Sequence, residues 1–127
     1  MKYLILVVGI FFLNVPSVMG EAITGAKFLQ KCSAVEKVNR VPVNEAETVY
    51  ATFCLGYITG FVDHYDVLDI NNNLKNKNIC LTSSESRLTN TLLVEVVLDY
   101  LRKNPKYRSL PIGQAVSLSL EEAFPCE

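Results

Sequence analysis

Few side chains in this 127-residue chain could do chemistry, and its only histidine is His64. His64 lies close in sequence to Asp63, Asp66 and Asp69, a grouping that could form a metal site or a proton-transfer group. A hydrolytic zinc site normally takes three protein ligands, and a calcium site needs a looped backbone. Because these residues fall on a predicted helix, we interpret them as its polar end and expect no metal and no other cofactor.

The other reactive side chains are four cysteines, Cys32, Cys54, Cys80 and Cys126. A catalytic Cys–His pair needs contact at about 3 Å. Cys54 and His64 are ten residues apart on one predicted helix, which is roughly 15 Å. The sequence also has no glycine-rich phosphate loop and no nucleophile elbow. We therefore predict no catalytic residues and a protein that is not an enzyme.

The first twenty residues have the pattern of an export signal. Lys2 supplies a positive charge, residues 3–13 form an unbroken apolar run, and Val18 and Gly20 are small residues at the −3 and −1 positions before Glu21. A transmembrane anchor is the alternative, but eleven helical residues cover only about half of the hydrocarbon core. We predict a signal peptide over 1–20 and a mature domain over 21–127, with no membrane association after cleavage.

In a short exported chain an even number of cysteines is typical of disulfides. Zinc is the competing interpretation, but zinc ligands usually occur in close pairs, and these cysteines are 22, 26 and 46 residues apart. Two disulfides are therefore predicted.

Capping signals and apolar periodicity predict four helices and no sheet. The first begins at Thr24, and the second begins with a capping box of Asn44 and Glu47. A second capping box at 82–85 starts the third helix, which stops before Asn104-Pro105, and Pro125 ends the fourth. The second helix has one wide apolar face, made by Tyr50, Phe53, Cys54, Tyr57, Ile58, Phe61, Val62, Tyr65 and Leu68. The predicted fold class is all-α, a small four-helix bundle stapled by disulfides.

Two glycines, Gly56 and Gly60, lie one turn apart on the second helix, and each costs about 1 kcal/mol of helix propensity. Close approach of another helix would compensate for this cost, and a bound ligand is the alternative. The tyrosines fall mostly on apolar faces, and we expect most of them in the core.

The helix layout favours one of the three possible cysteine pairings. If the third and fourth helices form an antiparallel hairpin, Cys80 and Cys126 lie near each other, which leaves Cys32 for Cys54. All three pairings stay open at this point.

Charge excludes some partners and suggests one surface. Removing the leader takes away Lys2, so the formal net charge goes from −1 to about −2, a balance that predicts no binding to nucleic acid. The segment 102–108 is basic and stiffened by proline, and it carries Tyr107. Arginine and tyrosine are enriched at binding hot spots, and the alternative is an ordinary solvated loop.

Several motifs resemble the Rap/Tai family of periplasmic immunity proteins of type VI secretion systems. They are CLGYITG at 54–60 with Asp63, Cys80-Leu81, YLRKNP at 100–105 with Arg108, and EAFPC at 122–126. The resemblance runs in order along essentially the whole mature chain. It implies an all-helical, often dimeric protein that binds and blocks a peptidoglycan amidase effector, a papain-like cysteine peptidase, and needs no chemistry of its own.

We accordingly predict two sets of residues. The predicted partner-binding residues are Lys103, Asn104, Lys106, Tyr107 and Arg108, followed by the asparagine-rich stretch 71–78. The motif residues predicted to support the fold are Gly56, Tyr57, Gly60, Asp63, Tyr100, Pro105, Phe124 and Pro125. The alternative function is a periplasmic interaction or chaperone-like helical domain that has no link to a toxin.

Overall fold

The computed structural model describes residues 22–38, 40–70, 78–81 and 88–126. Over these residues the chain forms the α-helices α2 (Gly25–Cys32), α3 (Glu45–Ile70), α4 (Asn90–Lys103) and α5 (Ile112–Ala123), and the 3-10 helix η3 (Pro105–Tyr107). The described part contains isolated bridges but no strand. The predicted all-α fold class is confirmed. The predicted signal peptide lies outside the described residues.

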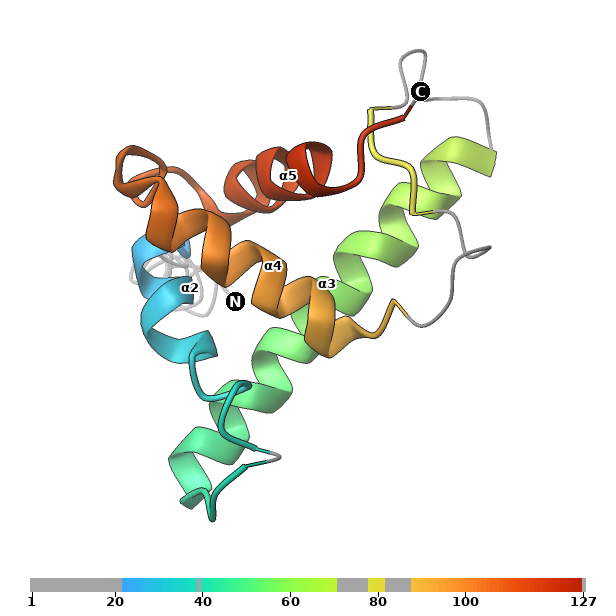
Figure 1. The fold of residues 1–127 in the computed structure, drawn as a ribbon. Coiled ribbons are helices and arrows are strands. Elements are labelled where there is room, and N and C mark those ends of the chain that lie inside the picture. The colour runs from blue at the N-terminus through green and yellow to red at the C-terminus, as the bar shows by residue number, and fades with distance from the viewer. Residues whose placement is uncertain (1–21, 39, 71–77, 82–87, 127) are drawn as a thin grey trace, which may run out of the picture.

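The central helix is α4, which packs against α2, α3 and α5. Figure 1 shows α4 in the middle of the molecule, with α5 above it, α2 at its lower left and the long α3 beside its first turns. Its inward side chains Val94, Val97, Leu98 and Leu101 are fully buried and form the middle of the core. None of the described helices combines the length and the apolar character needed to cross a membrane.

The first two helices begin at the predicted capping residues. The Thr24 hydroxyl accepts a hydrogen bond from the backbone of Lys27 at 3.4 Å. The Asn44 side chain accepts from the backbone of Glu47 at 2.9 Å, and the Glu47 carboxylate accepts from the backbone of Asn44 at 3.2 Å. This reciprocal pair satisfies two backbone donors that the helix itself leaves unpaired, so the predicted capping box is confirmed.

The start of the third helix differs from the prediction. The helix α4 begins at Asn90, where Thr89 is the N-cap and its hydroxyl accepts from the backbone of Leu92 at 3.2 Å. The capping box proposed at 82–85 lies outside the described residues. The predicted stop is confirmed, since α4 ends at Lys103 and Pro105 begins η3. Capping residues occur at several positions before this helix, so the capping pattern alone does not fix where the helix begins. The N-cap of α4 is Thr89.

Two disulfides join the elements in the favoured pairing. Cys32–Cys54 connects α2 to α3, with Cα atoms 5.7 Å apart, and Cys80–Cys126 connects the segment before α4 to the end of the chain, with Cα atoms 5.0 Å apart. Backbone contacts support the second bridge, since Cys80 donates to the carbonyl of Phe124 at 2.9 Å. The described part has no free cysteine.

The prediction that Gly56 and Gly60 receive a closely packed helix is wrong. A Cβ atom built at either position meets nothing within 4 Å. The reason is the helical period: the fully buried Cys54 and Ile58 lie two residues away and turn the glycines to the outer side of α3. Close packing occurs at Gly25 instead, where a Cβ would lie 2.9 Å from the Leu101 side chain and 3.1 Å from the Tyr107 carbonyl oxygen.

This arrangement gives opposite expectations for alanine at different glycines. Replacing Gly56 and Gly60 with alanine should raise the free energy of unfolding by about 1 kcal/mol each, because alanine restricts the unfolded chain and meets open space. The matched change Gly25→Ala should lower it by about 1–3 kcal/mol through overpacking. Urea unfolding of the three variants checks both signs. A loss of stability at Gly56 or Gly60 would contradict the exposed placement.

Candidate partner-binding surface

The described structure places the candidate chemical residues where they cannot act together. Cys54 is buried in a disulfide and has no free thiol. Asp63, His64 and Asp66 are exposed on α3. No group of three histidine, cysteine, aspartate or glutamate residues in the described ranges is arranged to hold a metal ion.

Two of the residues predicted to bind a partner make bonds that complete α4. The Arg108 guanidinium donates to the carbonyl of Leu101 at 2.8 Å and to that of Arg102 at 3.1 Å. The Asn104 side-chain amide donates to the carbonyl of Tyr100 at 3.0 Å. The carbonyls of Leu101 and Arg102 belong to the last turn of the helix, which has no backbone donors of its own to offer them. The Tyr100 carbonyl also accepts from the backbone of Asn104 at 2.9 Å. Arg108 and Asn104 thus cap α4 at its C-terminal end.

Tyr107 is also packed within the protein. Its ring stacks on the ring of Tyr100, with centroids 5.6 Å apart and planes 3° apart, and the Lys106 ammonium lies 4.7 Å from the Tyr107 ring centroid. Tyr100 is buried, and this burial raises the pKa of its hydroxyl. Lys103 is exposed and forms a surface ion pair with Asp99 at 3.5 Å. Of the five predicted partner-binding residues, Lys103 and Lys106 are the exposed ones.

The residues predicted to support the fold have different environments. Tyr57 and Phe124 pack against the core and Tyr100 lies within it. Pro105 starts η3, and Pro125 pairs with Ile79 in an isolated bridge beside the second disulfide. Asp63, Gly56 and Gly60 face solvent.

Large apolar side chains are exposed on the first turns of α3. Val49, Tyr50 and Phe53 expose 59%, 38% and 38% of their surface. Tyr50 and Phe53, which belong to the predicted apolar face of the second helix, are therefore not part of the core. The buried face of this part of α3 is made by Ala51, Cys54 and Ile58.

These side chains line a groove between α2 and α3, which we call the α2–α3 groove and which encloses about 510 Å³. It is lined by Ile23, Lys27, Gln30 and Lys31 from the α2 side, and by Val49, Tyr50 and Phe53 from α3. A smaller hollow of about 280 Å³ shares Gln30, Lys31 and Tyr50 with it and extends towards Lys37 and Glu47. The two hollows form one continuous surface.

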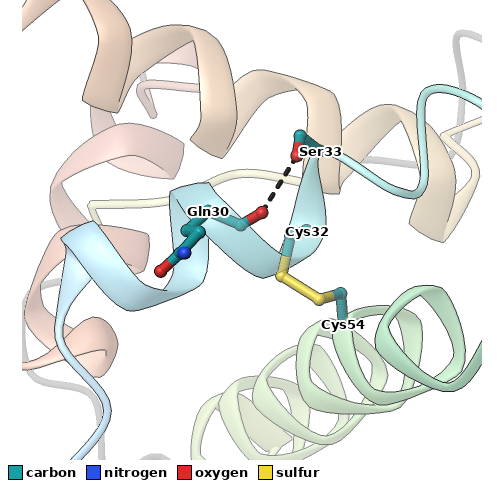
Figure 2. Close-up of a disulfide and its surroundings, with 4 residues drawn as sticks. All are labelled: Gln30, Cys32, Ser33 and Cys54. Atoms are coloured by element: carbon teal, nitrogen blue, oxygen red, sulfur yellow. Dashed lines mark hydrogen bonds between the residues drawn. A yellow bond between two sulfur atoms is a disulfide. The ribbon is translucent and has the colours of Figure 1, made fainter. Parts of the chain in front are cut away.

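The geometry of the groove depends on how α2 is fixed to α3. Figure 2 shows the disulfide from Cys32 at the end of α2 to Cys54 on α3, with Gln30 and Ser33 on either side of Cys32. The Ser33 hydroxyl donates to the Gln30 carbonyl at 3.0 Å and closes the last turn. Phe28, fully buried, packs edge-on against Tyr57 with ring centroids 5.9 Å apart. These contacts hold the lysines of α2 beside the aromatic rings of α3.

The α2 side of the groove carries lysine side chains. The Lys31 ammonium lies 4.7 Å from the centroid of the Tyr50 ring, a cation–π distance. At the far end Lys37 pairs with Glu47 at 2.9 Å, and the Lys37 hydrogen bond, with that of the Asn44 backbone, holds the pKa of Glu47 below its ordinary value. The α2 segment carries Lys27 and Lys31 and no carboxylate.

Sequence reasoning did not identify this groove. Val49, Tyr50 and Phe53 extend the apolar arc of α3 beyond the width that one buried face needs. That excess was the available signal for a second, exposed apolar surface. The lysines of α2 gave no signal, because single lysines on a short amphipathic helix are ordinary.

Comparison with known proteins gives one match. The model of the family described as Rap1a immunity proteins matches residues 24–126, which covers all the described helices and both disulfides. No curated protein and no solved structure matches the chain.

Proposed function

The chain belongs to the Rap1a immunity protein family, and from this premise we propose that it binds and inhibits a peptidoglycan amidase effector of a type VI secretion system. The inhibition would take place in the periplasm and would protect the producing cell and its kin. The observation that carries the proposal is the family match over 24–126. The signal-peptide pattern of residues 1–20 and the two disulfides support the location, because disulfides persist in oxidising compartments.

The inhibitor acts by covering the amidase rather than by chemistry. Its cysteines are held in disulfides, and its exposed aromatic side chains, Tyr50 and Phe53, are of the kind that form protein interfaces. A bound helical domain of this size excludes the cell-wall substrate from the cleft of the enzyme. In this mechanism the affinity of the inhibitor for the amidase sets the degree of protection.

The test begins with the gene beside that of this chain, which the proposal expects to encode a Cys/His amidase. Sending that amidase to the periplasm of a susceptible host should lyse the cells, and co-expressing the full chain should restore growth. A control chain that lacks residues 2–20 should not protect, because it stays in the cytoplasm. Lysis that the exported chain does not prevent would refute the proposal for this amidase. Suppression of aggregation of unrelated unfolded proteins would then favour a chaperone-like domain.

A further inference from the structure

The α2–α3 groove has the features of a surface that another chain covers. Val49, Tyr50 and Phe53 lie together on one wall, with between 38% and 59% of their surfaces exposed. A contiguous apolar patch with a polar rim marks an interaction site in a soluble protein. Gly56, one turn beyond Phe53 on α3, adds no side chain and leaves open space above the helix. A partner element can therefore approach this wall closely.

The charged side chains at the rim of the groove indicate which charge a complementary partner would carry. Lys27 and Lys31 of α2 line the groove, and the ammonium of Lys31 rests over the Tyr50 ring. Lys37 lies farther along, and its charge is balanced by Glu47. Lys31 thus places a positive charge at the aromatic wall of the groove, on a chain whose net charge is −1.

Carboxylates gather instead around another exposed apolar side chain, Leu92 on α4. A hollow there is lined by Glu36, Glu95 and Asp99 together with Leu92 and Arg40. Arg102 pairs with Glu36 at 2.7 Å and holds the pKa of Glu36 below its ordinary value, so this carboxylate stays charged. Carboxylates thus lie at the rim of the surface around Leu92, where the α2–α3 groove has Lys31, and the α2–α3 groove is the one that suits an acidic partner.

We propose that the α2–α3 groove receives a segment of the amidase effector in which an apolar side chain is flanked by carboxylates. This inference rests on the proposed function and adds the surface and the chemistry of its partner. The apolar side chain packs against Tyr50 and Phe53, and the carboxylates face Lys31. Aromatic side chains in a desolvated centre supply most of the affinity of an interface. Lys31 speeds association and discriminates against partners with basic segments.

The apolar part of the proposal is tested with two matched serine variants. Phe53→Ser removes a ring in the groove that is 38% exposed, and Leu92→Ser removes a side chain on the acidic surface that is 40% exposed. Binding is measured by calorimetry to the purified amidase of the neighbouring gene with its catalytic cysteine replaced by alanine. Phe53→Ser should raise Kd by about 30-fold or more, and Leu92→Ser should change it by less than about 3-fold. Thermal unfolding of both variants shows whether each is folded.

The charge part has its own matched pair, which also covers the case in which Phe53→Ser does not fold. Lys31→Glu and Arg40→Glu make the same change of charge, one in the groove and one on the surface around Leu92. Lys31→Glu should slow association and raise Kd by about 10-fold at low salt, and the effect should shrink as salt is added. Arg40→Glu should leave Kd within about 3-fold.

The outcomes separate this inference from the function on which it rests. If the wild-type chain does not bind the amidase, the proposed function fails. If it binds and only the Leu92 or Arg40 variant weakens binding, the function stands and the groove is not the docking surface. If Phe53→Ser turns a dimer into a monomer in sedimentation and leaves amidase binding unchanged, a second copy occupies the groove and the inference is overturned.

Discussion

A chain in which Cys32 and Cys54 are both replaced with alanine should have a free energy of unfolding about 5 kcal/mol lower than the wild-type chain. The disulfide closes a loop with a sequence separation of 22, and restricting the unfolded chain to this extent contributes about 3.4 kcal/mol. Both side chains are fully buried, so their removal also leaves a space in the core, which adds about 1–2 kcal/mol. Urea unfolding of the oxidised proteins at 25 °C measures the difference.

The second disulfide provides the control. Its loop, with a separation of 46, gives an entropic contribution of about 4 kcal/mol, larger than that of the first. Cys80 and Cys126 are only half-buried, so their removal leaves little empty space. We therefore expect Cys80→Ala with Cys126→Ala to cost less than the first pair. The reverse order would mean that chain entropy alone decides the cost and that the burial of Cys32 and Cys54 adds nothing.

The parts of the fold that the sequence predicts correctly are those that local chemistry determines. The cap at Thr24 and the capping box of Asn44 and Glu47 each depend on bonds within four residues. The stop before Pro105 follows from a steric restriction on the preceding residue. The disulfide pairing was accessible because it needs only the order of the helices and the position of each cysteine relative to them.

The errors concern which side of an element its neighbours cover. Tyr50 and Phe53 have the period of a buried face, but α2 covers only part of the first turns of α3 and leaves a groove. Gly56 and Gly60 resemble a packing motif and face solvent. Composition also did not indicate that the Arg108 guanidinium bonds the end of α4, and the role of Arg108 in partner binding stays a prediction. Such placement is set by contacts between residues far apart in sequence, which periodicity and composition do not report.

The second large effect is expected at Phe28. Replacing Phe28 with alanine should lower the free energy of unfolding by about 3–5 kcal/mol, because the ring is fully buried and packs against Tyr57. The helix α2 has eight residues, which is too short to be stable in isolation. It depends on Phe28 and on the Cys32 disulfide for its position. The control is Leu29→Ala on the next residue, which is half-buried and should cost less.

Variants at Phe28 and Phe53 also distinguish two causes of weaker binding to the effector, the displacement of α2 and the loss of a groove side chain. Phe28 does not line the α2–α3 groove, whereas Lys27 and Lys31 on the same helix do. If the groove binds the effector, Phe28→Ala should weaken binding together with stability, because α2 is no longer held against α3. Phe28→Leu, which keeps most of the volume, should restore much of both. Phe53→Ser should weaken binding while the chain stays folded. If Phe28→Ala kept full affinity although hydrogen exchange showed that α2 is no longer protected while α3 and α4 remain folded, the position of α2 would not matter for binding, and the lysines on it could not be part of the interface.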